Sequence, residues 1–173
     1  MLFDHPGRAL DLGCGAGRDT RYLVAHGWQV TAVDQEADAI AHLADLPRAN
    51  LRAAQSSLED FDYEKEAYDL ISAQFSLPFI SRSRFDEAFS RIKAAIKPGG
   101  VFTGQFFGPH DTWNTPDSDM TFHTQEQVND LLGDLRIVEA SEVDRPGNTA
   151  TGEMKHWHVF HIIAQKDKKS IDG

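Results

Sequence analysis

Five residues near the N-terminus have the types and spacing needed to bind a nucleoside. Asp11 precedes three glycines at alternate positions, Gly13, Gly15 and Gly17, and Asp34 follows Gly13 by 21 residues. Glycine permits positive φ and lets a ligand approach the backbone without meeting a Cβ atom. An acid about 20 residues after such a turn is placed to accept hydrogen bonds from ribose hydroxyls. These residues predict a nucleoside site.

Two strands and a helix are expected to position these groups. Residues 9–12 predict a short apolar strand, residues 18–26 a helix that Gly27 ends, and residues 29–33 a β-branched strand. Asp34 then lies at the end of the second strand. Ligands bind at the carboxyl ends of parallel strands, where strand order reverses. The glycine turn would therefore lie beneath the ligand, and the helix N-terminus would face an anionic part of it.

One position narrows the kind of nucleoside. The dinucleotide fingerprint G-x-G-x-x-G needs glycine at position 18, where this chain has Arg18. Residues 11–17, Asp-Leu-Gly-Cys-Gly-Ala-Gly, instead resemble motif I of the class I S-adenosylmethionine-dependent methyltransferases. Residues 97–100, Lys-Pro-Gly-Gly before an apolar strand, are a second point of resemblance. The alternatives are a glycine-rich turn without a ligand and an NAD-dependent oxidoreductase, which Arg18 and an antiparallel C-terminal hairpin disfavour.

The resemblance covers nearly the whole chain and implies an α/β, Rossmann-like doubly wound fold. Its seven-stranded sheet would have the order 3-2-1-4-5-7-6, with strand 7 antiparallel. Beyond the first two strands, the sequence predicts strands at residues 50–54, 68–73, 101–107, 135–143 and 157–165. Further helices are predicted at residues 36–46, 84–97 and 124–132, with a tight turn at 98–100 and a lid or substrate loop at 108–122. A Thr124-x-x-Gln127 capping box would begin the last helix.

The same resemblance implies S-adenosylmethionine as cofactor and S-adenosylhomocysteine as product. Asp11 and the backbone of the glycine turn, including Cys14, would hold the methionine end. Asp34, with Gln35 beside it, would hold the ribose. Cys14 is more consistent with a small side chain in a glycine turn than with a nucleophile.

The adenine and the methyl group would meet residues further along the chain. By resemblance, Ser57 would hydrogen-bond the adenine amine and Leu58 would lie against the ring, although a polar turn explains Ser57 equally well. Gln74 would form part of the wall that faces the methyl group. Phe75 and Phe79 are consistent either with a pocket wall that stacks on adenine or an apolar acceptor, or with core packing.

A looser resemblance concerns the last third of the chain. Residues 106–113, 120–123 and 155–160 are similar to the tellurite-resistance and thiopurine-type methyltransferases, whose acceptors are small, soft centres. The loop at 74–79 lacks the Asn/Asp-Pro-Pro-Tyr/Phe motif of many amine methyltransferases, so nothing commits the enzyme to such a nitrogen. A thiol or a chalcogen oxyanion is the expected acceptor, and no motif specifies which.

His156, His158 and Trp113 are the candidate catalytic residues on the substrate side. On a strand the two histidines share one face, where they would orient an anion or accept a proton. The alternative is that they are surface or hydrogen-bonded structural histidines, and that Trp113 packs its loop. No metal site is expected, because His161 would point to the opposite face from His156 and His158. Arg18 would pair with a carboxylate of substrate or cofactor, or form a salt bridge near its helix.

Composition places limits on partners and setting. The 173 residues predict a single domain, 1–173, with a flexible tail at 166–173. Family members usually carry helices before motif I, so we expect a partly open cofactor cleft or a chain that begins late. A net charge of −10 suits a small neutral or cationic substrate and disfavours nucleic acid. No apolar run reaches membrane length.

The single cysteine, Cys14, is consistent with a cytoplasmic protein. A cofactor-binding module without turnover remains the alternative of a different class, and no motif indicates an oligomeric state.

Overall fold

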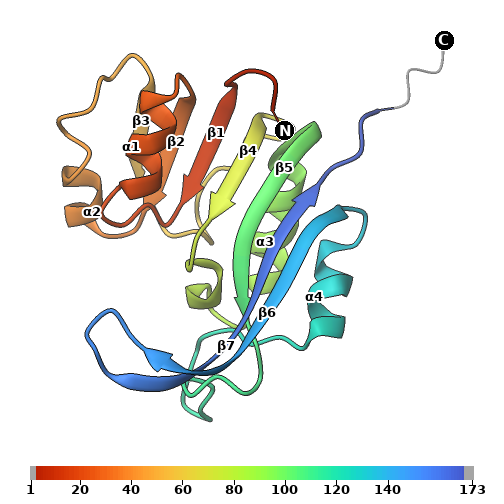
Figure 1. Cartoon of the computed structure of the whole chain (residues 1–173). Coiled ribbons are helices and arrows are strands. Elements are labelled where there is room, and N and C mark those ends of the chain that lie inside the picture. The colour runs from red at the N-terminus through yellow and green to blue at the C-terminus, as the bar shows by residue number, and fades with distance from the viewer. Residues whose placement is uncertain (1–2, 170–173) are drawn as a thin grey trace.

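A twisted sheet of seven strands organises the part of the chain that the structure describes (Figure 1). The computed structural model describes residues 3–169. The strand order is β3-β2-β1-β4-β5-β7-β6, and β7 is antiparallel to both of its neighbours, which confirms the predicted fold. The strands are β1 (Arg8–Leu12), β2 (Gln29–Asp34), β3 (Leu51–Gln55), β4 (Tyr68–Ala73), β5 (Ile96–Phe107), β6 (Arg136–Asn148) and β7 (Met154–Gln165).

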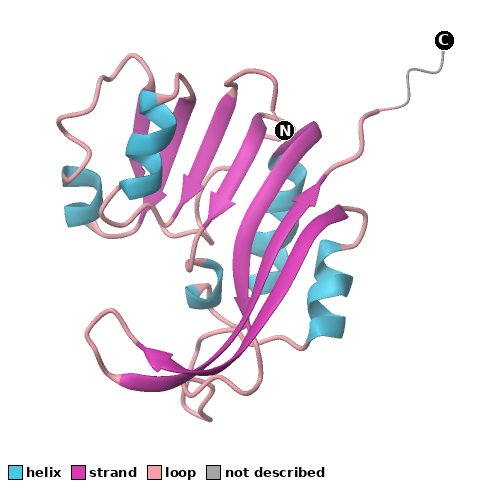
Figure 2. Ribbon diagram, in the orientation of Figure 1, coloured by secondary structure: helices cyan, strands magenta, loops and turns pink. Residues whose placement is uncertain are grey.

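Helices cover both faces of this sheet (Figure 2). They are α1 (Arg18–Ala25), α2 (Ala37–Ala41), the 3-10 helix η1 (Leu77–Phe79), α3 (Phe85–Ala95) and α4 (Gln125–Leu132). The main core lies on the side of α3 and α4 and includes Leu10 and Leu12 of β1. Ala9, which precedes Leu10 in the strand and points the opposite way, packs with Leu23 of α1 on the other face. Asp11 shares that second face, so β1 itself directs this carboxylate toward α1.

Helix α2 is shorter than predicted. The sequence pattern predicts a helix over residues 36–46, whereas α-helical bonding ends at Ala41. Leu43, Ala44 and Leu46 continue with i→i+3 hydrogen bonds instead. The Arg21 side chain of α1 donates to the carbonyl of His42 and pairs with Asp45. These contacts attach the tighter turns after α2 to α1.

The third helix ends two residues earlier than predicted. Residues 97–100 form an irregular insertion inside β5 rather than a turn before it, and the register between β4 and β5 shifts at this point. Gly99 has φ of 82°, which a side chain with a Cβ rarely adopts. The prediction for α4 was close, because the Thr124–Gln127 capping box is present with both of its hydrogen bonds.

The C-terminal hairpin is longer than its sequence indicated. Strands β6 and β7 extend through residues predicted to be loop and pair as far as Asn148 with Met154. Pro146 is accommodated because β6 is an edge strand, where a missing N–H costs no ladder bond. In Figure 1 the far half of the hairpin bends toward the side where β1 and β4 end.

The beginning of the predicted flexible tail is held to the sheet. Lys166 donates its backbone N–H to the carbonyl of Gly100 at 2.9 Å, and Lys169 pairs with Glu66 at 3.0 Å. Residues 170–173 of that predicted tail lie outside the described residues. Within residues 3–169, no helix has the length and apolarity needed to cross a membrane.

Candidate active site

The glycine turn after β1 is closely packed at its two ends, Gly13 and Gly17, and open at its middle residue, Gly15. Gly13, Gly15 and Gly17 all have positive φ, at 72°, 50° and 81°. A Cβ atom at Gly13 would lie 2.5 Å from the Cβ of Ser76, and one at Gly17 would lie 2.4 Å from a methyl of Leu43. A Cβ at Gly15 would meet no atom of the described residues within 4 Å. The turn therefore presents open backbone at Gly15 while its flanking glycines pack closely.

Asp34 links this turn to the next loop. One carboxylate oxygen accepts the backbone N–H of Gly15 at 2.9 Å, and the other accepts that of Glu36 at 2.9 Å. The backbone N–H groups of Gly13 and Cys14 meanwhile donate to the carbonyl of Val33. Asp34 therefore lies at the carboxyl end of β2 with both oxygens at the edge of the turn, as the sequence predicts for a ribose-binding acid.

Two adjoining pockets follow the carboxyl ends of the strands. The first is lined by Gly13, Asp34, Gln35, Ser56, Ser57, Leu58, Glu59, Phe75, Ser76, Phe79 and Ile80. The second is lined by Asp11, Gly13, Cys14, Ala16, Arg18, Asp19, Gln74 and Phe75. Gly13 and Phe75 belong to both, so the pockets meet between the glycine turn and the end of β4.

The predicted cofactor residues are thus brought together from distant parts of the chain. Nine of them line the two pockets: Asp11, Gly13, Cys14, Asp34, Gln35, Ser57, Leu58, Gln74 and Phe75. Gly15 and Gly17 shape the turn instead. Ser76, Glu59 and Ile80 also line the first pocket, and no motif in the sequence predicts them there. The feature that places Ser76 at the pocket is its close packing against Gly13, and this contact is visible only in the folded chain.

Asp11 is a buried carboxylate at the floor of the second pocket. Thr20 of α1 donates its hydroxyl to Asp11 at 2.5 Å. Burial raises the pKa of Asp11 to about 6, although the Thr20 hydrogen bond acts in the opposite direction. Burial likewise raises the pKa of Cys14 to about 12, so this thiol is protonated at neutral pH and is a poor nucleophile.

Ser57 is already engaged within its own loop. Its hydroxyl donates to the Asp60 carboxylate at 3.0 Å and accepts the Asp60 backbone N–H at 3.1 Å. These are the bonds of a polar turn, the alternative that the sequence left open. Ser57 and Leu58 still line the first pocket, so this turn supplies one of its walls.

Phe75 adopts a left-handed backbone conformation at the junction of the pockets. Its φ is 50°, and the residue is 46% exposed. The backbone N–H of Phe75 donates to the side-chain oxygen of Gln105 at 2.7 Å, and the Gln105 amide donates to Gln74 at 2.7 Å. Non-glycine residues in this region of φ are uncommon and cluster at functional sites.

Three aromatic side chains, Phe107, Trp113 and Trp157, form an aromatic wall beside Phe75. The ring centroid of Phe75 lies 6.4 Å from the centroids of Phe107 and Trp157, and the centroid of Trp113 lies 5.6 Å from that of Trp157. Phe79, which lines the first pocket, lies 6.5 Å from Trp113. Trp113 thus belongs to a surface beside the pockets rather than to the main core.

A buried ion pair supports the two tryptophans. The Lys155 ammonium lies 2.6 Å from Asp111 and sits 3.8 Å and 3.7 Å from the ring centroids of Trp113 and Trp157. Both charged side chains are almost fully buried. Asp111 also accepts the backbone N–H of Trp113 at 3.0 Å. The pair therefore fixes the loop after β5 against β7.

His156 and His158 point away from the aromatic wall. Directly paired residues of antiparallel strands share a face, and Phe160 pairs with Phe106, which belongs to the core on the side of α3. His158 follows the same alternation; it is buried and lies 5.0 Å from the ring of Phe160. His156 binds Asp144 at 2.5 Å. The expectation that these two rings face the substrate side therefore has no support in the geometry.

His161 is the imidazole that lies beside the pockets. It pairs with Gln105 across β5 and β7, and its ring lies 6.0 Å from that of Phe75. Strand alternation predicts that His161 lies on the opposite face from His156 and His158, and this is confirmed, but the sequence alone gives His161 no role. His161 is identified as a residue of the site by its pairing with Gln105, and this pairing depends on the register between β5 and β7.

Comparison with known proteins agrees with this geometry. Residues 9–100 match the family described as methyltransferase domain. A probable S-adenosyl-L-methionine-dependent methyltransferase TehB from Haemophilus influenzae is 31% identical over 97 residues, which is 55% of this chain and 34% of the relative. Hemagglutinin 1 from Eikenella corrodens is also 31% identical over 97 residues and is covered to 32%. The chain thus spans about a third of the length of these curated relatives.

Solved structures share the fold over most of the chain. TehB from Haemophilus influenzae superposes with a TM-score of 0.79 at 22% identity, covering 94% of this chain and 58% of that one. A Burkholderia thailandensis 1,6-didemethyltoxoflavin-N1-methyltransferase, solved with bound 1,6-didemethyltoxoflavin and S-adenosylhomocysteine, gives a TM-score of 0.70 at 24% identity, covering 95% of this chain and 72% of that one. The match over residues 9–100, with the sheet order and the glycine turn, shows that this chain belongs to the methyltransferase domain family and has the class I S-adenosylmethionine-dependent fold.

Proposed function

We propose that this chain binds S-adenosylmethionine across the two pockets and transfers its methyl group to a small-molecule acceptor. The observation that carries the proposal is the meeting of the pockets at Gly13 and Phe75, with Asp34 in one and Asp11 in the other. A nucleoside in the first pocket and an amino-acid extension in the second would place the sulfonium at that junction.

The second pocket has the charges that the amino-acid end of the cofactor requires. Asp11 and Asp19 offer carboxylates to an ammonium group, and Arg18 offers a guanidinium to a carboxylate. In the first pocket, Asp34 lies where ribose hydroxyls would donate to it, and Leu58 and Phe79 offer apolar surface to adenine. The product, S-adenosylhomocysteine, would occupy the same groups.

A thiol or a chalcogen oxyanion is the acceptor class that we propose. The aromatic wall of Phe107, Trp113 and Trp157 offers polarisable surface beside Phe75, which suits a soft acceptor. Methyl transfer forms a bond from the acceptor atom to the methyl carbon and breaks the carbon–sulfur bond of the sulfonium. The protein's main contribution is to align the two reactants. A protonated thiol also releases its proton, and His161 is the nearest imidazole to Phe75 that could accept it.

Calorimetric titration with S-adenosylmethionine, S-adenosylhomocysteine and NAD is the first test. Saturable binding of the first two ligands and none of NAD is expected. Turnover is then measured with a panel of small thiols, of selenium and tellurium oxyanions and, for comparison, of small amines, following the formation of S-adenosylhomocysteine.

The two measurements separate the parts of the proposal. Binding of NAD alone would contradict the cofactor assignment. Binding of S-adenosylmethionine without turnover on any acceptor would favour a cofactor-binding module over an enzyme. Turnover confined to amines would retain the enzyme and reject the acceptor class. The cytoplasmic setting expected from the single cysteine stays a prediction.

A further inference from the structure

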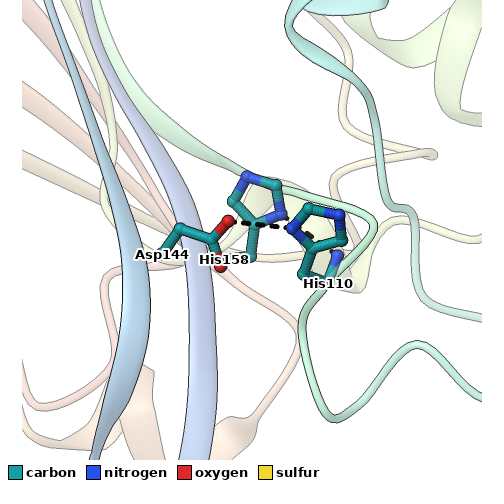
Figure 3. Close-up of side chains that lie close together, drawn as sticks. All are labelled: His110, Asp144 and His158. Carbon is teal, nitrogen blue, oxygen red and sulfur yellow. Dashed lines mark hydrogen bonds and ion pairs between the residues drawn. The ribbon is translucent and has the colours of Figure 1, made fainter.

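Three chain segments bring imidazole and carboxylate groups together behind the aromatic wall. His110 lies in the loop after β5, Asp144 on β6 and His158 on β7 (Figure 3). One ligand atom from each of these residues lies within 4.8 Å of the others. The His110 Nδ1 atom is 2.8 Å from the Asp144 carboxylate, and the two imidazole rings stack with their centroids 4.7 Å apart.

The hydrogen bonds of His158 define which nitrogen carries a lone pair. Its Nε2 atom lies 2.8 Å from the Glu142 carboxylate and therefore donates. Its Nδ1 atom accepts the backbone N–H of His110 at 3.1 Å, so the lone pair is on the side of His110. A metal-bound histidine usually donates one ring N–H to a carboxylate and directs the lone pair of its other nitrogen at the ion.

We propose that His110, Asp144 and His158 bind a divalent transition-metal ion of the zinc type. Two imidazole nitrogens and one carboxylate oxygen form a donor set that suits zinc and nickel better than the hard ions magnesium and calcium. Binding through His158 Nδ1 would replace its hydrogen bond from the His110 backbone N–H. Binding through His110 Nδ1 would require the proton that this atom now donates to Asp144 to move to Nε2. Glu142 would remain the outer carboxylate of His158, and His156 would hold the second oxygen of Asp144.

Such an ion would join the acceptor side of the molecule to the hairpin. His110 is followed closely by Asp111 and Trp113, which contact Lys155 and Trp157 of β7. Gly108 allows this loop to approach, since a Cβ there would lie 2.3 Å from His158 Nδ1. The proposal does not depend on the cofactor pockets, whose lining residues are different.

Metal titration of the full chain, purified without a histidine tag and stripped with chelator, tests this site. Calorimetry with zinc chloride and nickel chloride is expected to show one saturable site per chain, and magnesium chloride none. His110→Ala is the main variant because the His110 side chain is 66% exposed, so its loss leaves the core intact. It is expected to weaken zinc binding at least 10-fold, as is Asp144→Asn.

The matched control is His42→Ala, which removes an exposed histidine directly after α2 and should bind zinc like the parent. Zinc should also raise the melting temperature of the parent and not of His110→Ala, because a ligand of the native state stabilises it. Equal zinc affinity in the parent and in His110→Ala, or the absence of a saturable zinc site, would overturn the proposal. Weakening in His42→Ala of the same size would do so too.

Discussion

The backbone N–H of Phe75 donates to the Gln105 side chain at 2.7 Å while Phe75 itself has φ of 50°. A phenylalanine in the left-handed region costs about 1–3 kcal/mol, which the surroundings must offset. Gln105 is buried in β5 and cannot turn away, because its amide also donates to Gln74. The end of β4 is thus held in a strained conformation at the point where the two pockets meet.

The first prediction concerns this pair of residues. Gln105→Leu should lower the free energy of unfolding by about 1–3 kcal/mol, since the Phe75 N–H loses its acceptor. It should also weaken S-adenosylmethionine binding, because the junction of the pockets loses its shape. Chemical denaturation and calorimetry measure the two effects. Gln29→Leu, at an exposed position at the start of β2, is the control, and a cofactor affinity that stays at the parent value in Gln105→Leu would contradict the prediction.

The second prediction concerns Asp34. Asp34→Ala should weaken S-adenosylmethionine binding by about 1–3 kcal/mol, because hydroxyl groups that it would accept are left without a partner. The variant also removes the acceptor of the Gly15 and Glu36 N–H groups, so unfolding is measured alongside binding. Asp38→Ala, in the exposed first turn of α2, should bind like the parent. Parent-like affinity in Asp34→Ala would remove this residue from the site.

The third prediction follows from the raised pKa of Asp11. The folded chain has a pKa of about 6 at this carboxyl, and the unfolded chain one near 4. Between these values the folded state binds more protons, so this group's contribution to stability increases as the pH falls from about 6 to about 4 and is lost as the pH rises. Ionised Asp11 therefore costs up to about 3 kcal/mol at pH 7.

Asp11→Asn removes that charge and keeps an oxygen for Thr20. We expect it to be more stable than the parent at pH 7, with the difference vanishing below about pH 4, and to bind S-adenosylmethionine more weakly. Denaturation at several pH values measures the first effect. Thr20→Val isolates the hydrogen bond. A stability difference that is independent of pH would show that burial of the charge is not the cause.

The sequence predicts those features of the fold and of the site that depend on residues close together in the chain. The glycine turn, Asp34 and the capping box at Thr124 are encoded within a few residues of sequence, and the structure places them as expected. The register of β5 against β7 is not local. This pairing directs His161 toward Phe75 and His158 toward the core. The alternation of side chains along a single strand shows that it has two faces, but it does not show which face packs on the core.

Longer-range errors have the same origin. The sequence predicts that the first strand of the hairpin ends at Val143, because Pro146 and Gly147 are typical of turns. Strand pairing nevertheless continues past both residues, since they lie on an edge strand. His110 and Asp144 are 34 residues apart, so their meeting depends on where the loop after β5 returns to β6. The buried Lys155–Asp111 pair likewise joins residues 44 apart.

The fourth prediction concerns that buried pair. Lys155→Met leaves the Asp111 charge without its partner and should destabilise the fold by about 3–5 kcal/mol. The double variant Lys155→Met with Asp111→Asn should recover part of this loss, because no buried charge is then uncompensated. Thermal and chemical denaturation of the parent, single and double variants measure the coupling. A double variant less stable than Lys155→Met would contradict this account.

The fifth prediction separates His161 from His156. His161→Asn should lower turnover of a protonated thiol by about 100-fold if its imidazole accepts the proton, while S-adenosylmethionine affinity is retained. Turnover of an oxyanion acceptor should change little, because no proton is released. His156→Asn, which removes the partner of Asp144 on the other face of the strand, should leave thiol turnover near the parent value. The opposite result, with loss in His156→Asn and none in His161→Asn, would support the catalytic role that the sequence predicted for His156 and would contradict the role that the strand register gives to His161.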